Sequence, residues 1–200
     1  MQSFPFFIQL GFVHISDLTS YDHILFLVAL CAVYRIEQWR IIGILVTAFT
    51  VGHSITLVLA ALETLSIPSD IIEFLIPTTI MFTAFQNVLS RSSTGRHSKM
   101  LRNYALALFF GLIHGMGFSN YFRALLMGES NIFAPLLGFN LGIELGQLLV
   151  VVVIVSTAFL FLNVIRVRYR DWNVFVSGAA AGMSLMLMVE NQRMCGRCLL

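Results

Sequence analysis

The feature that most constrains this chain is a series of long apolar runs separated by short polar segments. A helix needs about 20 residues to cross a hydrocarbon core ~30 Å thick, and most of the runs are near that length. Only helices and closed barrels satisfy the backbone in lipid, and barrel strands would alternate with polar residues, which these runs do not. The sequence therefore predicts an all-α, polytopic membrane helix bundle with about six transmembrane helices, at residues 14 or 21 to 34, 41–62, 71–89, 104–122, 132–165 and 173–189.

Two of the runs have unusual lengths. Residues 4–13 are apolar but too short to span, so we expect an interfacial or half-spanning seventh helix before a break at 17–20. The run 132–165 is too long for one upright helix, so it tilts or begins as a short helix outside the core. We predict one transmembrane domain over 1–190 and a short tail over 191–200, in which Cys195 and Cys198 form a weak C-x-x-C signal.

Charged residues make up 11% of the chain, against about 25% in soluble domains. With a net charge of only +2, nothing suggests a nucleic-acid partner, and the lipid bilayer is the expected surrounding. The first, third and fifth connections hold most of the twelve Lys and Arg residues. Because basic loops stay in the cytoplasm, we predict a bacterial inner-membrane protein with both termini in the periplasm.

Small residues recur at a spacing that lets membrane helices approach closely. Glycines four residues apart occur in three of the runs, at Gly111 and Gly115, at Gly138, Gly142 and Gly146, and at Gly178 and Gly182. We interpret them as packing positions of a compact bundle.

Four of the five histidines fall in or beside apolar runs: His14, His23, His53 and His114. The fifth, His97, lies in a basic connection and is expected to be solvated. Counted from the predicted cytoplasmic ends at ~1.5 Å per residue, His23, His53 and His114 each lie ~15–18 Å deep. That depth is close to the middle of the membrane, where ionisable residues are costly and mark sites or pathways.

Other polar residues follow helical spacing. Asn140, Glu144 and Gln147 share one helix face, and Thr47, Thr50 and Ser54 share another. Any one of these side chains can simply hydrogen-bond a neighbouring helix. Taken together, the sequence predicts a cluster of imidazoles and carboxylates, with Asn140 and Gln147 in support: His14, His23, His53, His114, Asp22 and Glu144. This ligand set suits a divalent transition metal ion such as zinc, nickel or cobalt.

Four sequence blocks resemble one known family. The blocks "YDHILFLVAL", "VTAFTVGHSITLVLA", "FFGLIHGMGF" and "GFNLGIELGQ" occur in the order found in the second branch of the HupE/UreJ family of hydrogenase and urease accessory membrane proteins. The resemblance covers about residues 11–189. It implies a nickel or cobalt permease of the bacterial inner membrane.

The resemblance also carries over to single positions. Asp22 and His23 match the Asp-His pair of the family's first motif, and His114 matches the second histidine of its later F-H-G-x-[A/V]-H-G-x-E block. The chain departs from the pattern in three places. Seven residues rather than five separate His14 from Asp22, Phe110 replaces the first histidine of the later block, and Gly117 replaces its glutamate.

Three functions fit these observations, and the first is transport of nickel, cobalt or another divalent ion. Six helices are few for a transporter, so a homo-oligomer stays open as its working unit. The second is an intramembrane zinc-dependent hydrolase using Asp22, Ser54 and Glu144, although no H-E-x-x-H motif is present. The third is a metal-sensing or accessory subunit without turnover. We rank transport first and an enzyme below it.

Overall fold

The computed structural model describes residues 3–18, 21–62, 64, 67–89, 96–126 and 132–197, with backbone alone for 96–99 and 193–197. These residues form helices and connections, without a strand. The α-helices are α1 (Phe4–Ser16), α2 (Tyr21–Cys31), α3 (Trp39–Ala61), α4 (Ser69–Leu89), α5 (Arg96–Leu126), α6 (Phe133–Phe159) and α7 (Tyr169–Arg197). A 3₁₀ turn, η1 (Ile36–Gln38), precedes α3, and a π-helical turn, η2 (Leu160–Val164), follows α6.

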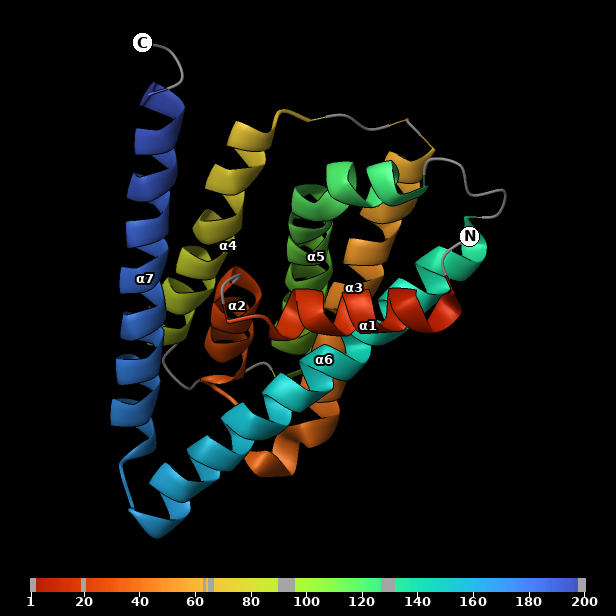
Figure 1. Ribbon diagram of the computed structural model, residues 1–200. Coiled ribbons are helices and arrows are strands. Elements are labelled where there is room, and N and C mark those ends of the chain that lie inside the picture. Colours follow the sequence, from red (N-terminus) through yellow and green to blue (C-terminus); the bar gives the residue numbers. More distant parts are fainter. Residues whose placement is uncertain are drawn as a thin grey trace.

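Within the described residues, five helices are long and apolar enough to cross a membrane. They match the last five predicted spans, so the prediction of a membrane helix bundle is confirmed. The first predicted span is different, because two short helices, α1 and α2, stand in its place (Figure 1). The 11 residues of α2 reach ~16 Å, about half of the hydrocarbon core.

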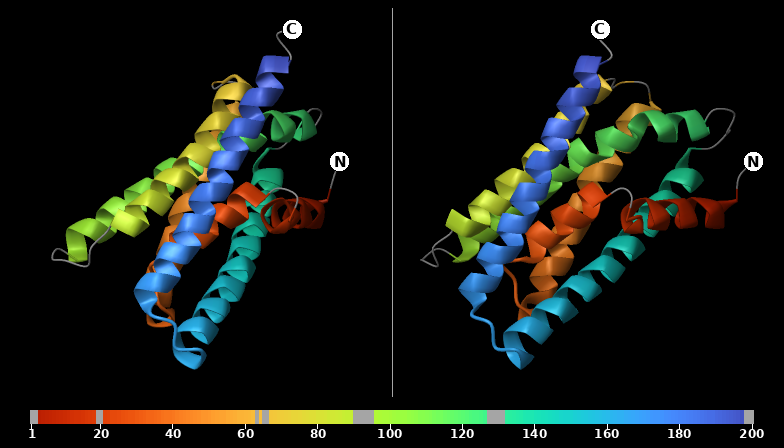
Figure 2. Two further views of the ribbon diagram at one scale, coloured as in Figure 1. Left: turned by 90° about the vertical axis from the view of Figure 1, so that its left-hand side faces the viewer. Right: turned by 60° about the vertical axis from the view of Figure 1, so that its left-hand side comes forward.

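The break between α1 and α2 follows from the local sequence. Asp17 lies just after the last turn of α1, and short polar residues of this kind compete with helical backbone hydrogen bonds. The Ser16 hydroxyl already donates to the Phe12 carbonyl, 2.7 Å away. Helix α1 then lies crosswise to the long helices, as both views of Figure 2 show. The predicted short N-terminal helix is therefore present and ends at Ser16, just before the predicted break, of which residues 19 and 20 lie outside the described residues.

The bundle is built from three closely packed helix pairs, α3 with α5, α1 with α6 and α4 with α7. Glycines set the first two. A Cβ atom on Gly52 of α3 would lie 2.1 Å from the Leu108 carbonyl oxygen of α5, and one on Gly142 of α6 would lie 2.1 Å from the Ile8 oxygen of α1. Gly178 and Gly182 differ from the prediction, because nothing lies within 4 Å of a Cβ at either position.

The longest apolar run forms one continuous, inclined helix rather than a helix preceded by a separate one (Figure 1). Its apolar residues face outward along much of its length, as expected where lipid is the solvent. Helix α7 extends to Arg197, into the segment predicted as a tail. The side chain of Cys195 and all of Cys198 lie outside the described residues.

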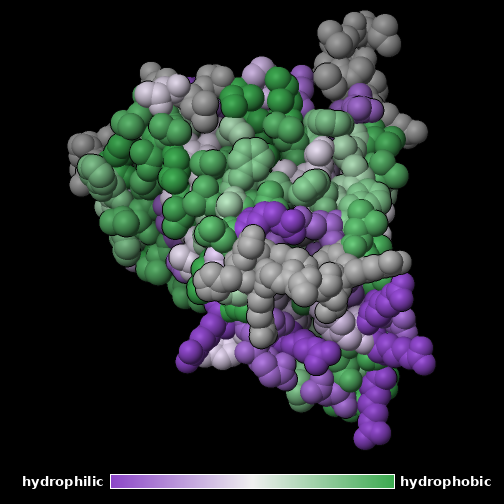
Figure 3. Space-filling view, turned by 180° about the vertical axis from the view of Figure 1, so that it is seen from behind, coloured by the Kyte–Doolittle hydropathy of each residue, from purple (hydrophilic) through white to green (hydrophobic). Residues whose placement is uncertain are grey.

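Polar and apolar surface are separated along the bundle axis. The lower end in Figure 3 is strongly hydrophilic, whereas the body above it is largely hydrophobic. Helices α3 and α7 begin at this lower end, and η2 ends there (Figure 1). Exposed arginines near these helix ends include Arg35, Arg40, Arg166, Arg168 and Arg170. The first and fifth basic connections thus share one end, as the topology prediction requires of them, whereas much of the third connection lies outside the described residues.

A proline inside α4 ties that helix to α7. Pro77 has no N–H, so the carbonyl of Glu73, four residues earlier, loses its helical partner. The Asn191 amide of α7 donates to this oxygen over 2.8 Å. A side chain from a neighbouring helix thereby satisfies the freed backbone group, as is usual in membrane helices.

Candidate metal centre

Four histidines from four helices meet inside the bundle. His14 ends α1, His23 begins α2, His53 lies in α3 and His114 lies in α5. The ring centroids of His14 and His23 are 4.7 Å apart, those of His14 and His53 5.9 Å, and those of His23 and His53 6.1 Å. His114 joins this triangle through His23, at 5.4 Å. The depth count from the sequence covered His23, His53 and His114, whereas the structure also makes His14 one of the three mutually adjacent rings.

The histidine nitrogens account for nearly all the unpaired buried polar side-chain atoms of the described residues. Five are imidazole nitrogens of this cluster, namely Nε2 of His14, His23 and His114 and both ring nitrogens of His53, and the sixth is the Tyr104 hydroxyl. Leaving a buried polar group without a partner costs about 1–3 kcal/mol. Such a concentration of unpaired imidazole nitrogens is expected at a ligand site rather than in a satisfied core.

Two of the rings are held in a defined orientation. The Nδ1 atom of His23 lies 3.1 Å from the Asp22 carboxylate, and Nδ1 of His114 lies 2.8 Å from the Phe110 carbonyl oxygen. Both partners are acceptors, so each Nδ1 carries the proton and each Nε2 presents a lone pair. A histidine that donates one ring nitrogen to a carboxylate or carbonyl and offers the other is the usual arrangement of a metal-ligating imidazole.

The ring separations are close to those that one shared ion requires. With metal–nitrogen bonds of ~2.0–2.1 Å and tetrahedral geometry, two bound imidazoles have centroids about 5 Å apart. As they stand, no three or more His, Cys, Asp or Glu side chains in the described part of the chain are arranged so that they could hold a metal ion. The rings would have to turn about their side-chain bonds, whereas the helices that carry them are already near enough.

A cavity of about 560 Å³ opens beside the cluster. His14, His23 and His114 line it together with Asp22, whereas His53 is fully buried behind them. Its opposite wall comes from the α4·α7 pair and includes Glu73, Pro77 and Asn191. The volume is within the range of small-molecule sites, about 300–1,000 Å³, and far exceeds the room that one ion and its water molecules need.

The remaining predicted site residues lie elsewhere, in a ladder between α3 and α6. The Thr47 hydroxyl donates to Glu144 over 2.9 Å, the Thr50 hydroxyl to Gln147 over 2.7 Å, and the Ser54 hydroxyl to Asn140 over 2.6 Å. The two polar faces predicted from the sequence therefore pair with each other. Glu144 does not line the cavity, so the structure does not bring it to the histidines.

The comparison with protein families gives one match. The profile described as "HupE / UreJ protein" matches residues 1–192. The chain belongs to the HupE/UreJ family. The predicted family is thus confirmed, and membership supports an integral membrane protein concerned with metal ions. The comparisons with curated proteins and with solved structures found no match.

In this HupE/UreJ chain, Phe110 is one of the two residues that depart from the family's later block, and it packs among other aromatic rings. Phe110 lies below the cluster, where its ring centroid is 6.0 Å from that of Phe26. The ring of Phe49 stacks on Phe26 at 4.7 Å, and both lie about as close to His114, at 5.1 and 5.2 Å. An aromatic layer defined by Phe26, Phe49 and Phe110 therefore separates the histidines from the basic end of the bundle.

Sequence reasoning missed one charged residue at the cavity of the HupE/UreJ protein. Glu73 lines the cavity opposite the histidines. It lies inside the apolar run 71–89, and an ionisable residue in such a run is a functional candidate by default. That signal was available from the sequence. The contact of α7 with α4 that brings Asn191 to the same rim had no such signal.

Substitutions of the two predicted carboxylates, Glu144 of α6 and Asp22 of α2, are expected to affect nickel binding differently. The substitution Glu144→Gln keeps an acceptor for Thr47 and lies away from the cavity, so nickel affinity should stay within about twofold. The substitution Asp22→Asn removes the charge that orients His23 and should weaken nickel binding about 10–100-fold, the usual loss for a supporting carboxylate. Isothermal titration of nickel into the detergent-purified variants measures both. If both variants lost nickel affinity to the same extent, Glu144 would have to be counted among the metal ligands.

Proposed function

We propose that this HupE/UreJ protein transports a divalent transition metal ion, nickel or cobalt before zinc, across the bacterial inner membrane. The histidine cluster (His14, His23, His53 and His114, with Asp22) is the site at which the substrate ion binds. The observation that carries the proposal is the set of five buried, unpaired imidazole nitrogens on and behind the wall of an open cavity. Both termini lie in the periplasm in this proposal, as the basic connections require.

The state of the cluster supports transport over permanent binding. A transported ion must bind well enough to enter the site and weakly enough to leave it. The imidazoles are near the spacing for one ion but are not preformed as a coordination shell. Turning the rings towards an ion costs free energy. This cost lowers the net affinity of the cluster for the ion and so favours exchange. The broken α1–α2 segment also supports the proposal, since discontinuous helices near the midplane form many transporter sites.

A route towards the basic end continues below the aromatic layer. A small cavity of about 30 Å³ is lined there by Phe110 and by polar residues, among them Tyr34, Asn87 and Asn103. The Asn103 amide donates to the Tyr34 hydroxyl over 3.0 Å. The two cavities share no lining residue; Phe110 lines the small one and lies one helical turn before His114, which lines the large one. The ion would thus reach the histidines from the upper cavity and leave by moving this ring.

The intramembrane hydrolase is supported less well by the arrangement. Ser54, its candidate nucleophile, has the Asn140 amide oxygen and the Thr50 carbonyl oxygen as acceptors within reach of its single hydroxyl hydrogen, and it does not line the cavity. Glu144 is engaged by Thr47. Of the three residues that a hydrolase was expected to use, Asp22 alone lies at the cavity. An activated nucleophile needs its base within hydrogen-bond reach, and Ser54 has an amide and a carbonyl there instead.

Purified protein in liposomes tests the proposal. With a nickel- or cobalt-sensitive dye inside, the wild-type protein is expected to increase ion entry, and the substitution His114→Ala should reduce entry to the level of empty liposomes. The substitution Glu144→Gln serves as the control that keeps the flux. Liposomes that stay tight to nickel, cobalt and zinc would contradict transport. Zinc retained through dialysis in the same preparation would favour the hydrolase, and exchangeable binding without flux a sensing or accessory subunit.

A further inference from the structure

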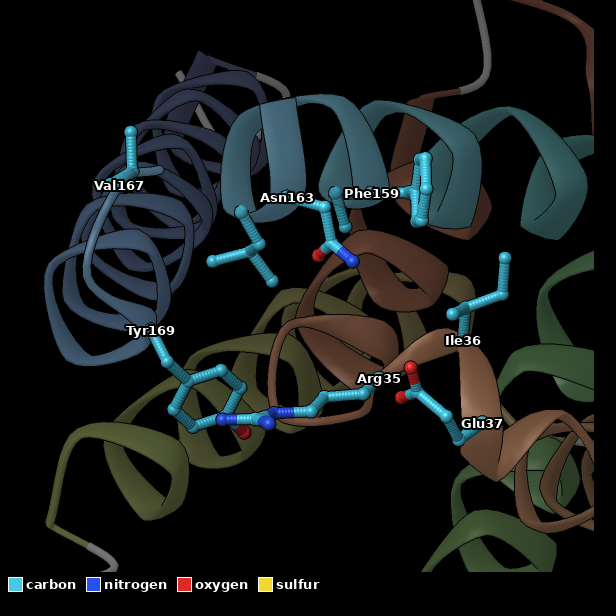
Figure 4. A pocket seen from close by; sticks show the side chains of 9 residues that line it. Arg35, Ile36, Glu37, Phe159, Asn163, Val167 and Tyr169 are labelled. Carbon is cyan, nitrogen blue, oxygen red and sulfur yellow. The ribbon is translucent and has the colours of Figure 1, made fainter. Parts of the chain in front are cut away.

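A second cavity lies at the basic end of the bundle, well away from the histidines. It has a volume of about 180 Å³ and is lined by Arg35 and η1 before α3, by the end of α6 with η2, and by the start of α7. The side chains that line it come from both polar and apolar classes (Figure 4), and include Arg35, Glu37, Tyr169, Asn163, Ile36 and Phe159. The cavity shares no lining residue with the one beside the histidines.

Two opposite charges are present in this cavity without pairing with each other. The Arg35 guanidinium lies over the Tyr169 ring, 5.1 Å from its centroid, and the Glu37 carboxylate lies on the other side of the cavity (Figure 4). The two groups do not form a salt bridge. Stacking engages the face of the guanidinium and leaves its N–H edge for an anion. The cavity therefore contains two separate groups for a ligand, the N–H donors of the Arg35 guanidinium and the carboxylate of Glu37.

The backbone around the cavity is built to hold it open. The end of α6 widens into the π-helical turn η2, and π-helical turns are frequent at functional sites. Arg166, just after this turn, has φ 62°, a left-handed conformation that is rare for a residue with a side chain. The turn places the Asn163 amide over the cavity, as Figure 4 shows. The Tyr169 hydroxyl is anchored by donating to the Val33 carbonyl oxygen over 2.5 Å.

The apolar walls and the position of the cavity point to lipid. Phe159 and Leu162 of the last apolar turns contribute to its lining. Trp39 begins α3, and Trp172 packs against Phe161 with ring centroids 5.2 Å apart. Tryptophan and tyrosine at such helix ends mark the level of the lipid headgroups. A ligand here meets charge at one end and hydrocarbon at the other.

We propose that this cavity binds the headgroup of a zwitterionic, amine-bearing phospholipid such as phosphatidylethanolamine. The Arg35 guanidinium donates to the phosphate, because its fork matches phosphate oxygens. The Glu37 carboxylate accepts from the ammonium group, and the Asn163 amide donates to a further headgroup oxygen. Basic pockets between transmembrane helices bind the phosphate-bearing headgroups of lipids such as cardiolipin, which supports the role of Arg35 towards the phosphate. The carboxylate selects the zwitterion over anionic lipids, which would meet like charge.

Binding of short-chain lipids to the detergent-purified full chain tests this proposal. Dioctanoyl phosphatidylethanolamine is compared with dioctanoyl phosphatidylglycerol and with free phosphoethanolamine, by native mass spectrometry. We expect the wild-type protein to bind the ethanolamine lipid about tenfold more tightly than either alternative. The substitution Arg35→Gln should weaken binding of both lipids by a similar factor. The substitution Glu37→Gln should remove the preference between them.

Arg170→Gln is the matched control, since Arg170 is an exposed arginine at the same end that does not line the cavity. It should bind as the wild type does. Equal binding of the two lipids to the wild-type protein, or unchanged binding to both Arg35→Gln and Glu37→Gln, would overturn the proposal. Tight binding of free phosphoethanolamine would also overturn it, since the ligand would then be a soluble headgroup rather than a lipid. None of these outcomes depends on metal transport.

Discussion

Replacing His53 with alanine is expected to abolish tight nickel binding and metal accumulation while the protein still reaches the membrane. His53 is fully buried, both of its ring nitrogens lack a partner, and its ring lies beside those of His14 and His23. Loss of a supporting residue already costs about 10–100-fold in metal affinity, so loss of a ligand should cost at least about 100-fold. Removing the unpaired nitrogens also relieves a desolvation penalty, which offsets part of the lost packing.

Isothermal titration with nickel and the nickel content of cells producing each variant measure this effect. His97→Ala is the control, because His97 lies in the first turn of α5, about five helical turns before His114, rather than in the predicted connection. Membrane fractionation with quantitative blotting shows whether each variant is inserted to the same level. If His53→Ala binds nickel as tightly as the wild type, His53 is not a ligand and the cluster must be reduced to its other members.

A second large effect is expected in the packing of α3 against α5. In the substitution Gly52→Ala, the new Cβ would lie 2.1 Å from the Leu108 oxygen and 3.0 Å from the Leu112 nitrogen. Both are backbone atoms, so the two helices have to separate. Overpacking of this kind costs about 1–3 kcal/mol, which corresponds to a melting temperature lower by about 5 °C. Thermal unfolding in detergent, followed by loss of helical circular dichroism, measures the shift.

The same helix provides the matched control. Nothing lies within 4 Å of a Cβ on Gly43, so Gly43→Ala introduces no clash. Alanine favours a helix over glycine by about 1 kcal/mol, and the melting temperature should therefore stay the same or rise. Equal destabilisation by both substitutions would mean that helix flexibility, and not the close approach of α3 and α5, makes these glycines necessary.

The long helices could be predicted from the sequence because lipid imposes a simple rule of length and composition. The runs 41–62, 71–89, 104–122 and 173–189 each correspond to one long helix. The exception was the first run, where a continuous span was expected to start at either 14 or 21. The apolar composition of this run did not indicate that α2 ends at Cys31. Most residues of α2 are buried against other helices, and such contacts need apolar side chains just as lipid does.

The sequence predicted which residues belong to the candidate site better than it predicted how they are arranged. The histidines were recognisable because ionisable side chains are rare at such depth. Helical spacing assigned Glu144 to the same group through the polar face that it shares with Asn140 and Gln147, yet spacing carries no information about which neighbouring helix that face meets. Glu144 faces Thr47 across α6 and α3, and this pairing of faces depends on the crossing of two helices distant in the sequence. The depth count did not include His14, because the position of its helix, which lies crosswise, could not be predicted from length and apolarity.

The division of the bundle into three pairs has a consequence for how the protein can move. Within α3·α5 and α1·α6, backbone touches backbone at glycines, so each pair behaves as a rigid body. His53 and His114 belong to the first, His14 belongs to the second, and His23 sits on α2 between them. The α4·α7 pair forms the wall across the cavity. The imidazoles therefore lie at the seam where these bodies meet. A small rotation of one helix pair against another changes the distances between the imidazole rings, while the contacts within each pair persist. Substitutions on the outer side of a pair are therefore expected to change the affinity for the ion without contacting a ligand.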